Sequence, residues 1–453
     1  MLCHTASVAT LALAGLAEDP RPDAIGSVDS SIVAARCHWA QPAQEELCDI
    51  VLEAVEAAWP AQVEGMGFHA PMPDDDGVLD LYITGVGTEG GAYALGTYVD
   101  EDTTDGRMGS HAFVALSPQI PRNLLHSYVG HEFNHVLQYG TDFTENALTL
   151  WEGSANVADW YTHPGQTLDE IYIEDFQAVP WGGLVIDSYI LYDDHDLWSY
   201  YEYGSMLWNV YLEAEFGGEG IATAAVWAAG EQRGWTNEPD VLDALDEVTG
   251  DWQLAWLDFA LQRTLVGTGD APDWVDGLDD PGLALDVALE VDGSALLEEG
   301  VALVWPDLPY ESGAVYARLD SLPPGEEITL SVDAEWSADV VWGLVVSGAP
   351  AGDEAVIGGT LRFVAPDDGS AVIVGAVNLG ARGWDIDDGI QQVEIVVDVT
   401  AGGAEAPDPE FPDEGDSGLG GDEKGCGCAG APGPAGGGVA ILGLGLLAAR
   451  RRR

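Results

Sequence analysis

The chain has 453 residues, 47% of them hydrophobic, so it is long enough for two or three domains with real cores. This composition argues against a disordered polyanion, although the formal net charge is −65. So much carboxylate argues against a nucleic-acid partner, because a phosphate backbone is bound by clustered Lys and Arg. We expect an acidic surface that keeps the protein hydrated and soluble.

The first seventeen residues have the character of an export signal. Residues 6–17 form a short apolar run that ends in Ala-Gly-Leu-Ala, which suits a signal peptidase. The segment before this run lacks Lys and Arg, so the signal is a weak one. We therefore expect residues 1–17 to be a signal peptide and the protein to be exported.

One pair of cysteines looks structural. Cys37 and Cys48 flank a short loop and the first turns of an expected helix at 44–59. In an exported protein this spacing allows one disulfide, and it matches no cysteine-based zinc site.

Residues 18–285 have the pattern of an α+β domain. Strand-like runs at 79–84, 92–99 and 112–116 are separated by turns rich in Gly and Asp. They precede a helix at 123–139, for which Gly140 is a suitable C-cap. The same periodicity predicts further helices at 145–161, 200–216, 220–232 and 250–263.

The helix at 123–139 contains the sequence His-Glu-Phe-Asn-His. His131 and His135 are four residues apart, so both imidazoles lie on one helix face and can reach one metal ion. Glu132 stands beside them, where a carboxylate can take a proton from a zinc-activated water and pass it to a leaving amine. The alternative is a helix with two surface histidines.

A third metal ligand is expected downstream. Gln138 and Thr141 occupy the positions where a metzincin has Gly and His, so that class is excluded. Glu152 follows His135 by seventeen residues on the expected helix at 145–161. Two imidazoles and one carboxylate leave the fourth zinc position open for water, as a hydrolase requires. Glu145 is the alternative ligand.

These motifs resemble the gluzincin metallopeptidases, because thermolysin-like enzymes supply a ligand carboxylate from an equivalent second helix. The resemblance places Asn156 where thermolysin-like enzymes have an aspartate that orients a ligand. Either Asn156 takes this role, or Asp159 does. Residues 30–400 as a whole resemble a myxobacterial-type family of HExxH metalloproteases that join a zincin core to a β-sandwich.

The resemblance also implies a donor for the oxyanion of the reaction. The sequence Tyr-Glu-Tyr-Gly at 201–204 is similar to the Tyr-Glu-Lys-Gly helix start of aminopeptidase gluzincins. By this match Tyr201 is the first candidate and Tyr203 the second. His195 is a further candidate, by analogy with the histidine donor of thermolysin-like enzymes. Alternatively, the tyrosines only pack the start of a helix.

The acidic loop at 100–106 offers alternating oxygen donors that end in Gly. It could bind Ca²⁺, but it departs from the spacing of an EF-hand loop and lacks the distal Glu. An exposed acidic turn is the alternative interpretation.

Residues 286–400 contain about seven short β runs with turns between them, which is typical of an all-β sandwich. This region contains no catalytic constellation. We expect a spacer, a folding partner or a substrate-binding module.

The C-terminal segments predict attachment to the cell surface. An acidic Gly/Pro-rich tether at 401–424 precedes Cys426 and Cys428, an apolar stretch at 436–449 and four arginines. Arginines after an apolar stretch hold it in the membrane. Residues 425–453 resemble the myxobacterial C-terminal sorting signal, which implies an apolar membrane helix, a sorting protease and retention at the surface. A simple tail anchor with palmitoylated cysteines is the alternative.

Together these features predict a surface-anchored zinc endopeptidase that acts on protein or peptide substrates. The Gly-x-Met-Glu-Asn strand with which aminopeptidases bind a free amine is missing from the sequence. The alternative is a surface adhesion or matrix protein that has a zincin fold and little turnover.

Overall fold

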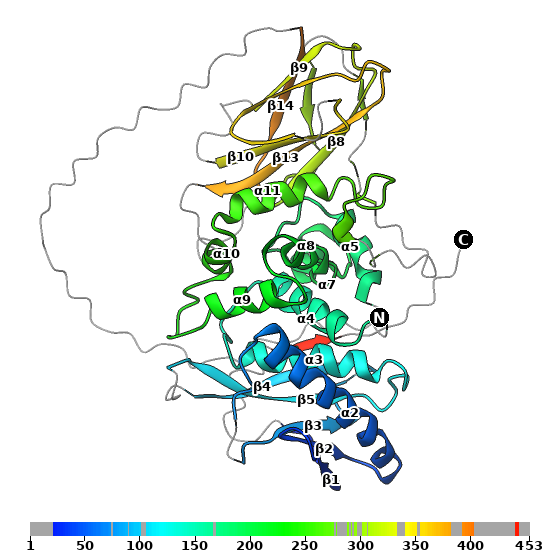
Figure 1. Ribbon diagram of the computed structural model, residues 1–453, viewed down its shortest axis with the longest axis vertical. Coiled ribbons are helices and arrows are strands. Elements are labelled where there is room, and N and C mark those ends of the chain that lie inside the picture. Colours follow the sequence, from blue (N-terminus) through cyan, green and yellow to red (C-terminus); the bar gives the residue numbers. More distant parts are fainter. Residues whose placement is uncertain are drawn as a thin grey trace, which may run out of the picture.

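The protein was analysed as a computed structural model (Figure 1). It describes residues 21–402 and the strand backbone of Ala440–Gly443. Within the first range it leaves out residues 74–75, 89, 101–105, 166–168, 276–277, 279–287, 290, 292–293, 297–300, 306, 333–339, 351–353 and 382–391. The predicted signal peptide, the tether, Cys426, Cys428 and most of the acidic loop lie outside the described residues.

The N-terminal region is built on a mixed sheet of six strands with the order β1-β2-β3-β5-β4-β15. β2 and β5 run parallel to β3, whereas β1, β4 and β15 pair antiparallel with their neighbours. The strands are β1 (Gly26–Asp29), β2 (Ala35–Trp39), β3 (Leu79–Ile83), β4 (Ala92–Asp100), β5 (Gly109–Leu116) and β15 (Ala440–Gly443). The three strands predicted in this region are present.

Two helices, α2 (Cys48–Trp59) and α3 (Leu125–Tyr139), lie between the sheet and the rest of the molecule (Figure 1). Their buried faces carry apolar residues at helical spacing, such as Val51 and Val55 on α2, which pack into one core with the sheet. Cys37 on β2 and Cys48 at the start of α2 form a disulfide, which ties this helix to the sheet.

A layer of helices follows on the far side of α3 (Figure 1). It comprises α4 (Leu148–Thr162), α5 (Ile173–Ala178), α6 (Ser188–His195), α7 (Tyr201–Gly204), α8 (Met206–Phe216), α9 (Ile221–Ala229), α10 (Val241–Thr249) and α11 (Trp252–Gln262). Short helical turns complete the region at Pro42–Leu47, Pro60–Met66, Asp169–Tyr172 and Asp273–Val275. The helix predicted at 200–216 is two helices, α7 and α8, which meet at Ser205.

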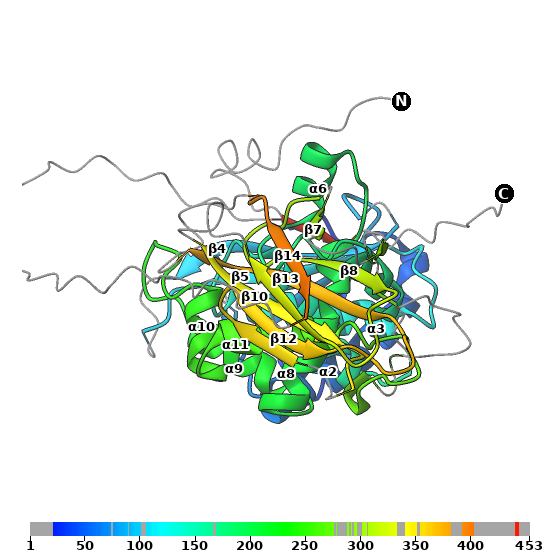
Figure 2. The ribbon, with the colours of Figure 1, turned by 90° about the horizontal axis from the view of Figure 1, so that it is seen from above.

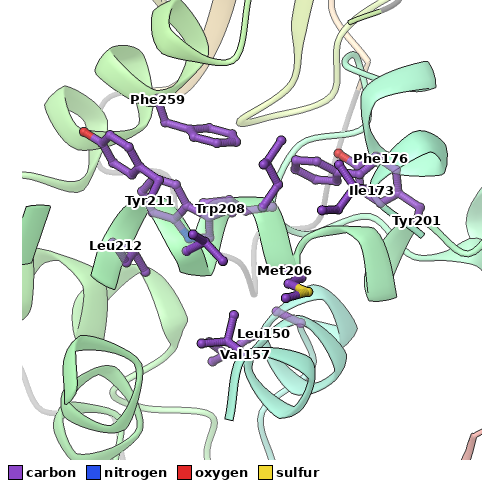
Figure 3. Packing of buried hydrophobic residues seen from close by; sticks show 14 of the residues in the cluster. Leu150, Val157, Ile173, Phe176, Tyr201, Met206, Trp208, Tyr211, Leu212 and Phe259 are labelled. Atoms are coloured by element: carbon purple, nitrogen blue, oxygen red, sulfur yellow. The ribbon is translucent and has the colours of Figure 1, made fainter. Parts of the chain in front are cut away.

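Large aromatic side chains fill the centre of this layer. Trp208, Tyr211 and Phe259 pack together, with Trp208 and Phe259 at 5.2 Å between ring centroids (Figure 3). Their burial stabilises the helical layer, because each large aromatic side chain removes 150–250 Å² or so of apolar surface from water.

The C-terminal region consists of two largely antiparallel sheets. Their strand orders are β11-β10-β13-β8-β6 and β12-β9-β14-β7, and buried side chains of both belong to one core. The strands are β6 (Ser294–Leu296), β7 (Val301–Val304), β8 (Ala314–Asp320), β9 (Glu327–Val332), β10 (Val340–Ser347), β11 (Glu354–Ile357), β12 (Thr360–Val364), β13 (Val372–Ala381) and β14 (Val396–Ala401).

The β region rests on α11 (Figure 1). Tyr316 on β8 donates a hydrogen bond to the carbonyl oxygen of Ala260, and a Cβ atom on Gly343 would lie 2.5 Å from Leu257. The absence of a side chain at Gly343 therefore allows β10 to pack closely against the helix. The two sheets thus pack against the helical layer through α11.

Candidate metal centre

His131 and His135 on α3 meet Glu152 on α4 at the interface of the two helices. Nε2 of His131 lies 3.0 Å from Nε2 of His135 and 3.1 Å from Oε2 of Glu152. The remaining pair, His135 Nε2 and Glu152 Oε2, is 3.4 Å apart. Among the described residues, this is the group of His, Cys, Asp and Glu that could hold a metal ion.

The spacing of these atoms fits a zinc ion. Ligand atoms at 2.0–2.2 Å or so from a tetrahedral zinc are separated from one another by about 3.3–3.6 Å. The observed separations of 3.0 to 3.4 Å are close to that range, and all three atoms converge on one point. Two imidazoles and a carboxylate are also a donor set that zinc prefers, with a fourth position left for water.

Two glycines allow α4 to pack closely against α3 on one side and against Ser205 on the other. A Cβ atom on Gly130 of α3 would lie 2.2 Å from Oδ1 of Asp159 on α4. A Cβ atom on Gly153 of α4 would lie 2.3 Å from Oγ of Ser205. These contacts leave no room for larger residues, so the two glycines set the distance from α4 to its neighbours.

Burial and mutual attraction fix the charges in the cluster. Burial opposes ionisation of Glu152, but the two nearby imidazoles lower its pKa to about 2. Burial lowers the pKa of His131. Burial also opposes protonation of His135, but Glu152, Glu132 and Gln138 together outweigh it and raise the pKa. Glu152 is therefore an anion near neutral pH, which is the state that binds a cation.

Gln138 orients His135, a role that the sequence analysis did not assign. Its Oε1 atom lies 2.6 Å from Nδ1 of His135, and its Nε2 atom is within hydrogen-bond distance of Asn134, Trp151 and Ser154. Since the amide nitrogen faces these acceptors, Oε1 must accept from Nδ1–H of His135. The lone pair of Nε2 is then free for the metal. The signal in the sequence was a Gln one turn beyond the second histidine.

Asn156 and Asp159 occupy different surroundings. The Asn156 side chain interacts with His131, where it favours the charged imidazole, and its Nδ2 atom donates to the carbonyl oxygen of Tyr203 at 3.0 Å. Asp159 instead accepts from Ser127 at 2.7 Å and contacts Nδ1 of His163 at 2.8 Å. The proposed role of Asp159 beside a ligand is therefore wrong, because α4 turns its side chain toward the start of α3.

Glu132 lies beside the cluster and is almost completely buried. Its Oε2 atom has no hydrogen-bond partner among the described residues, and burial raises the pKa of the carboxyl to about 8. A hydrogen bond from the backbone of Ala94 on β4 lowers this pKa, so β4 is a close neighbour of the carboxyl. The unpartnered Oε2 atom of this buried carboxyl is available for a reacting molecule.

The structure separates the two candidate tyrosines. The hydroxyl of Tyr201 donates to the carbonyl oxygen of Gly183 at 2.8 Å, and its ring packs against Phe176 in the core (Figure 3). Tyr203 instead stacks on His131, with 6.1 Å between the ring centroids. This short helix directs position 201 into the core and position 203 toward His131, so Tyr203 is the better placed of the two candidates.

Two further alternatives are also placed elsewhere. Glu145 accepts a hydrogen bond from the backbone nitrogen of Ala147 at 2.6 Å, before α4 begins, and does not belong to the metal cluster. His195 lies 3.0 Å from the hydroxyl of Tyr310 and packs its ring against Trp181. Both side chains have structural partners of their own.

The terminal segments are described only at Ala440–Gly443, within the stretch expected to form an apolar helix. These residues form the strand β15, paired with Ala92–Leu95 of β4, so the helix prediction is wrong there. In the part of the chain that the structure describes, none of the helices combines the length and apolar character needed to cross a membrane.

Comparison with known proteins gives no family. No family model matches the chain, and no curated protein matches it. Among solved structures, a family GH115 4-O-methyl-α-glucuronidase with specificity for decorated arabinogalactans aligns with 63% of this chain and 44% of its own length. That alignment has 11% sequence identity and a TM-score of 0.14, so it carries no argument about fold or function.

Proposed function

We propose that the protein is a zinc-dependent endopeptidase. The observation that carries this proposal is the convergence of His131, His135 and Glu152 on one point beside the buried Glu132 carboxyl. A hydrolase needs a metal with an open position and a general base next to it, and this arrangement supplies places for both.

In this proposal a bound zinc ion supplies Lewis acidity and lowers the pKa of a water molecule. The charge of the metal would favour the ionised form of Glu132, which would accept a proton from the attacking water and deliver it to the leaving amine of the peptide. The Oε2 atom of Glu132, which has no hydrogen-bond partner among the described residues, supports this role. Gln138 keeps His135 in the tautomer that presents Nε2 to the metal.

Tyr203 is the proposed donor to the oxyanion that forms on the substrate carbonyl. Its ring lies on His131, so it is next to the metal cluster. Burial and the carboxylates of Glu152, Glu202 and Glu132 raise its pKa well above the usual value. The phenol therefore stays protonated and can donate near neutral pH.

Export and attachment to the cell surface are part of the proposal. The disulfide between Cys37 and Cys48 supports maturation in an oxidising compartment. A sorting protease would act at Cys426 and Cys428, after the apolar stretch had held the chain in the membrane. The acidic loop at 100–106 remains a candidate calcium site.

The test uses the purified protein loaded with zinc, together with the Glu132→Gln variant and Glu247→Gln as a surface control. Cleavage of a mixed peptide library is followed by mass spectrometry, and bound zinc by elemental analysis. We expect Glu132→Gln to retain zinc and lose cleavage, while the control retains both. A native protein that binds zinc but cleaves no peptide would favour the adhesion or matrix protein.

A further inference from the structure

Four exposed apolar side chains lie on α6 and the segment after it. Tyr189, Tyr192, Leu197 and Trp198, the aromatic patch, have exposed fractions of 57%, 43%, 37% and 58%. The rings of Tyr192 and Trp198 contact each other at 5.4 Å between centroids. A contiguous exposed patch of this kind marks an interaction site more often than isolated apolar residues do.

The aromatic patch connects to the metal centre through ring contacts. Trp198 contacts Tyr200 at 6.4 Å, Tyr200 contacts Tyr203 at 6.1 Å, and Tyr203 stacks on His131 at 6.1 Å between centroids. Tyr172 packs against both Tyr200 and Tyr203. A continuous series of ring contacts therefore connects the exposed Trp198 to a metal ligand.

His131 is the most exposed of the three residues of the metal centre. The His131 side chain keeps 10% of its surface exposed, whereas His135 keeps 0% and Glu152 keeps 3%. His131 is also the ligand on which Tyr203 lies. A substrate that reaches the cluster past Tyr203 would also meet the rings of Tyr200 and Trp198.

The patch is held in place by the other face of α6. Asp187 caps the helix by accepting a hydrogen bond from the backbone nitrogen of Ile190 at 2.8 Å. Leu191 is buried in the core, and His195 lies 3.0 Å from the hydroxyl of Tyr310. Figure 2 shows α6 at the edge of the molecule. Since these contacts hold the helix, its outer aromatic residues form a preorganised surface.

The surroundings of the patch are acidic. Asp193, Asp194 and Asp196 are exposed at the end of α6, next to Tyr192 and Leu197. Such a rim attracts Lys and Arg side chains and repels acidic ones. Because the chain as a whole carries a net charge of −65, this preference is reinforced at longer range.

We infer that the aromatic patch is the substrate-binding surface for extended peptides with an aromatic residue several positions from the scissile bond and basic residues farther along. The inference rests on the proposed function and names its substrate class. Aromatic side chains of the peptide stack on Trp198 and Tyr192, and its basic residues face the acidic rim.

Binding is measured apart from cleavage, in the zinc-loaded full chain with Glu132→Gln. The probes are three fluorescein-labelled peptides of equal length: one with a central Phe and distal Arg residues, one with Ala replacing Phe, and one with Gln replacing Arg. We expect Trp198→Ala to weaken binding of the Phe peptide by about three- to tenfold, measured by fluorescence anisotropy. Binding of the Ala peptide should be unchanged.

Leu254→Ala is the matched control, since Leu254 is 54% exposed on α11. The double substitution Asp193→Asn and Asp194→Asn should weaken binding of the Arg peptide more than binding of the Gln peptide. This difference in affinity should become smaller at high salt. Equal binding of the Phe and Ala peptides, or equal effects of Trp198→Ala and Leu254→Ala, would overturn the inference. Peptide binding that depends on Trp198 without any cleavage by the native chain would refute only the proposed endopeptidase activity.

Discussion

The Nδ1 atom of His135 lies 2.6 Å from the Oε1 atom of Gln138, one turn farther along α3. The amide nitrogen of Gln138 faces three acceptors, so the side chain cannot turn over without losing those contacts. This arrangement sets the tautomer of His135 before any metal arrives.

The substitution Gln138→Leu should therefore weaken zinc binding by about 10- to 100-fold, the usual effect of removing the partner of a ligating imidazole. Zinc affinity is measured by competition with a chromophoric chelator, with folding checked by circular dichroism. Gln177→Leu is the control, because Gln177 is also buried and bonded, to Arg263. Equal zinc affinity of the two variants would contradict an orienting role for Gln138.

Glu152→Gln and Glu145→Gln distinguish the two glutamates that the sequence offered as ligands. Only Glu152 lies within the cluster of donor atoms, so Glu152→Gln should lose most of its bound zinc. Glu145→Gln should keep about one zinc per chain. Elemental analysis of the dialysed proteins measures both, and loss of zinc from Glu145→Gln alone would reverse the assignment.

Glu145 also predicts a dependence of stability on pH. Burial raises its pKa to about 8, so the folded chain holds this proton more tightly than the unfolded chain does. The resulting stabilisation is complete below the ordinary pKa of 4.5 and is lost as the pH rises through about 8.

Glu145→Gln can keep the acceptor for Ala147 but has no proton to lose. Relative to the native chain, it should gain free energy of unfolding between pH 4.5 and pH 9, on the order of a few kcal/mol. Urea unfolding of the zinc-free proteins at both pH values measures this. A difference between the two proteins that does not change with pH would show that Glu145 is ionised when folded.

Tyr203→Phe and Tyr201→Phe test the choice of the oxyanion donor. Tyr203→Phe should lower kcat about 10²- to 10³-fold and leave zinc content unchanged, since a donor acts only in the transition state. Tyr201→Phe should instead lose the bond to Gly183 and about 1 kcal/mol of stability, with kcat nearly unchanged. The opposite pattern of kcat effects would return the role to Tyr201.

The sequence by itself determined the local features of this protein. The spacing of His131 and His135 placed two imidazoles on one helix face, because an α-helix repeats every 3.6 residues or so. Short strand-like runs separated by turn residues likewise revealed the three strands before α3 and the change to a β region. These features depend on neighbours in the chain, so a pattern within a few turns is enough to reveal them.

Only the tertiary structure decided between residues that look alike in the sequence. Glu145 and Glu152 are both acidic residues near α4, yet only Glu152 faces α3. Tyr201 and Tyr203 differ by two positions, and the packing of a one-turn helix buries one and places the other on His131. The aromatic patch is likewise a product of packing, because α6 exposes its tyrosines only when its other face is held by Leu191 and Tyr310.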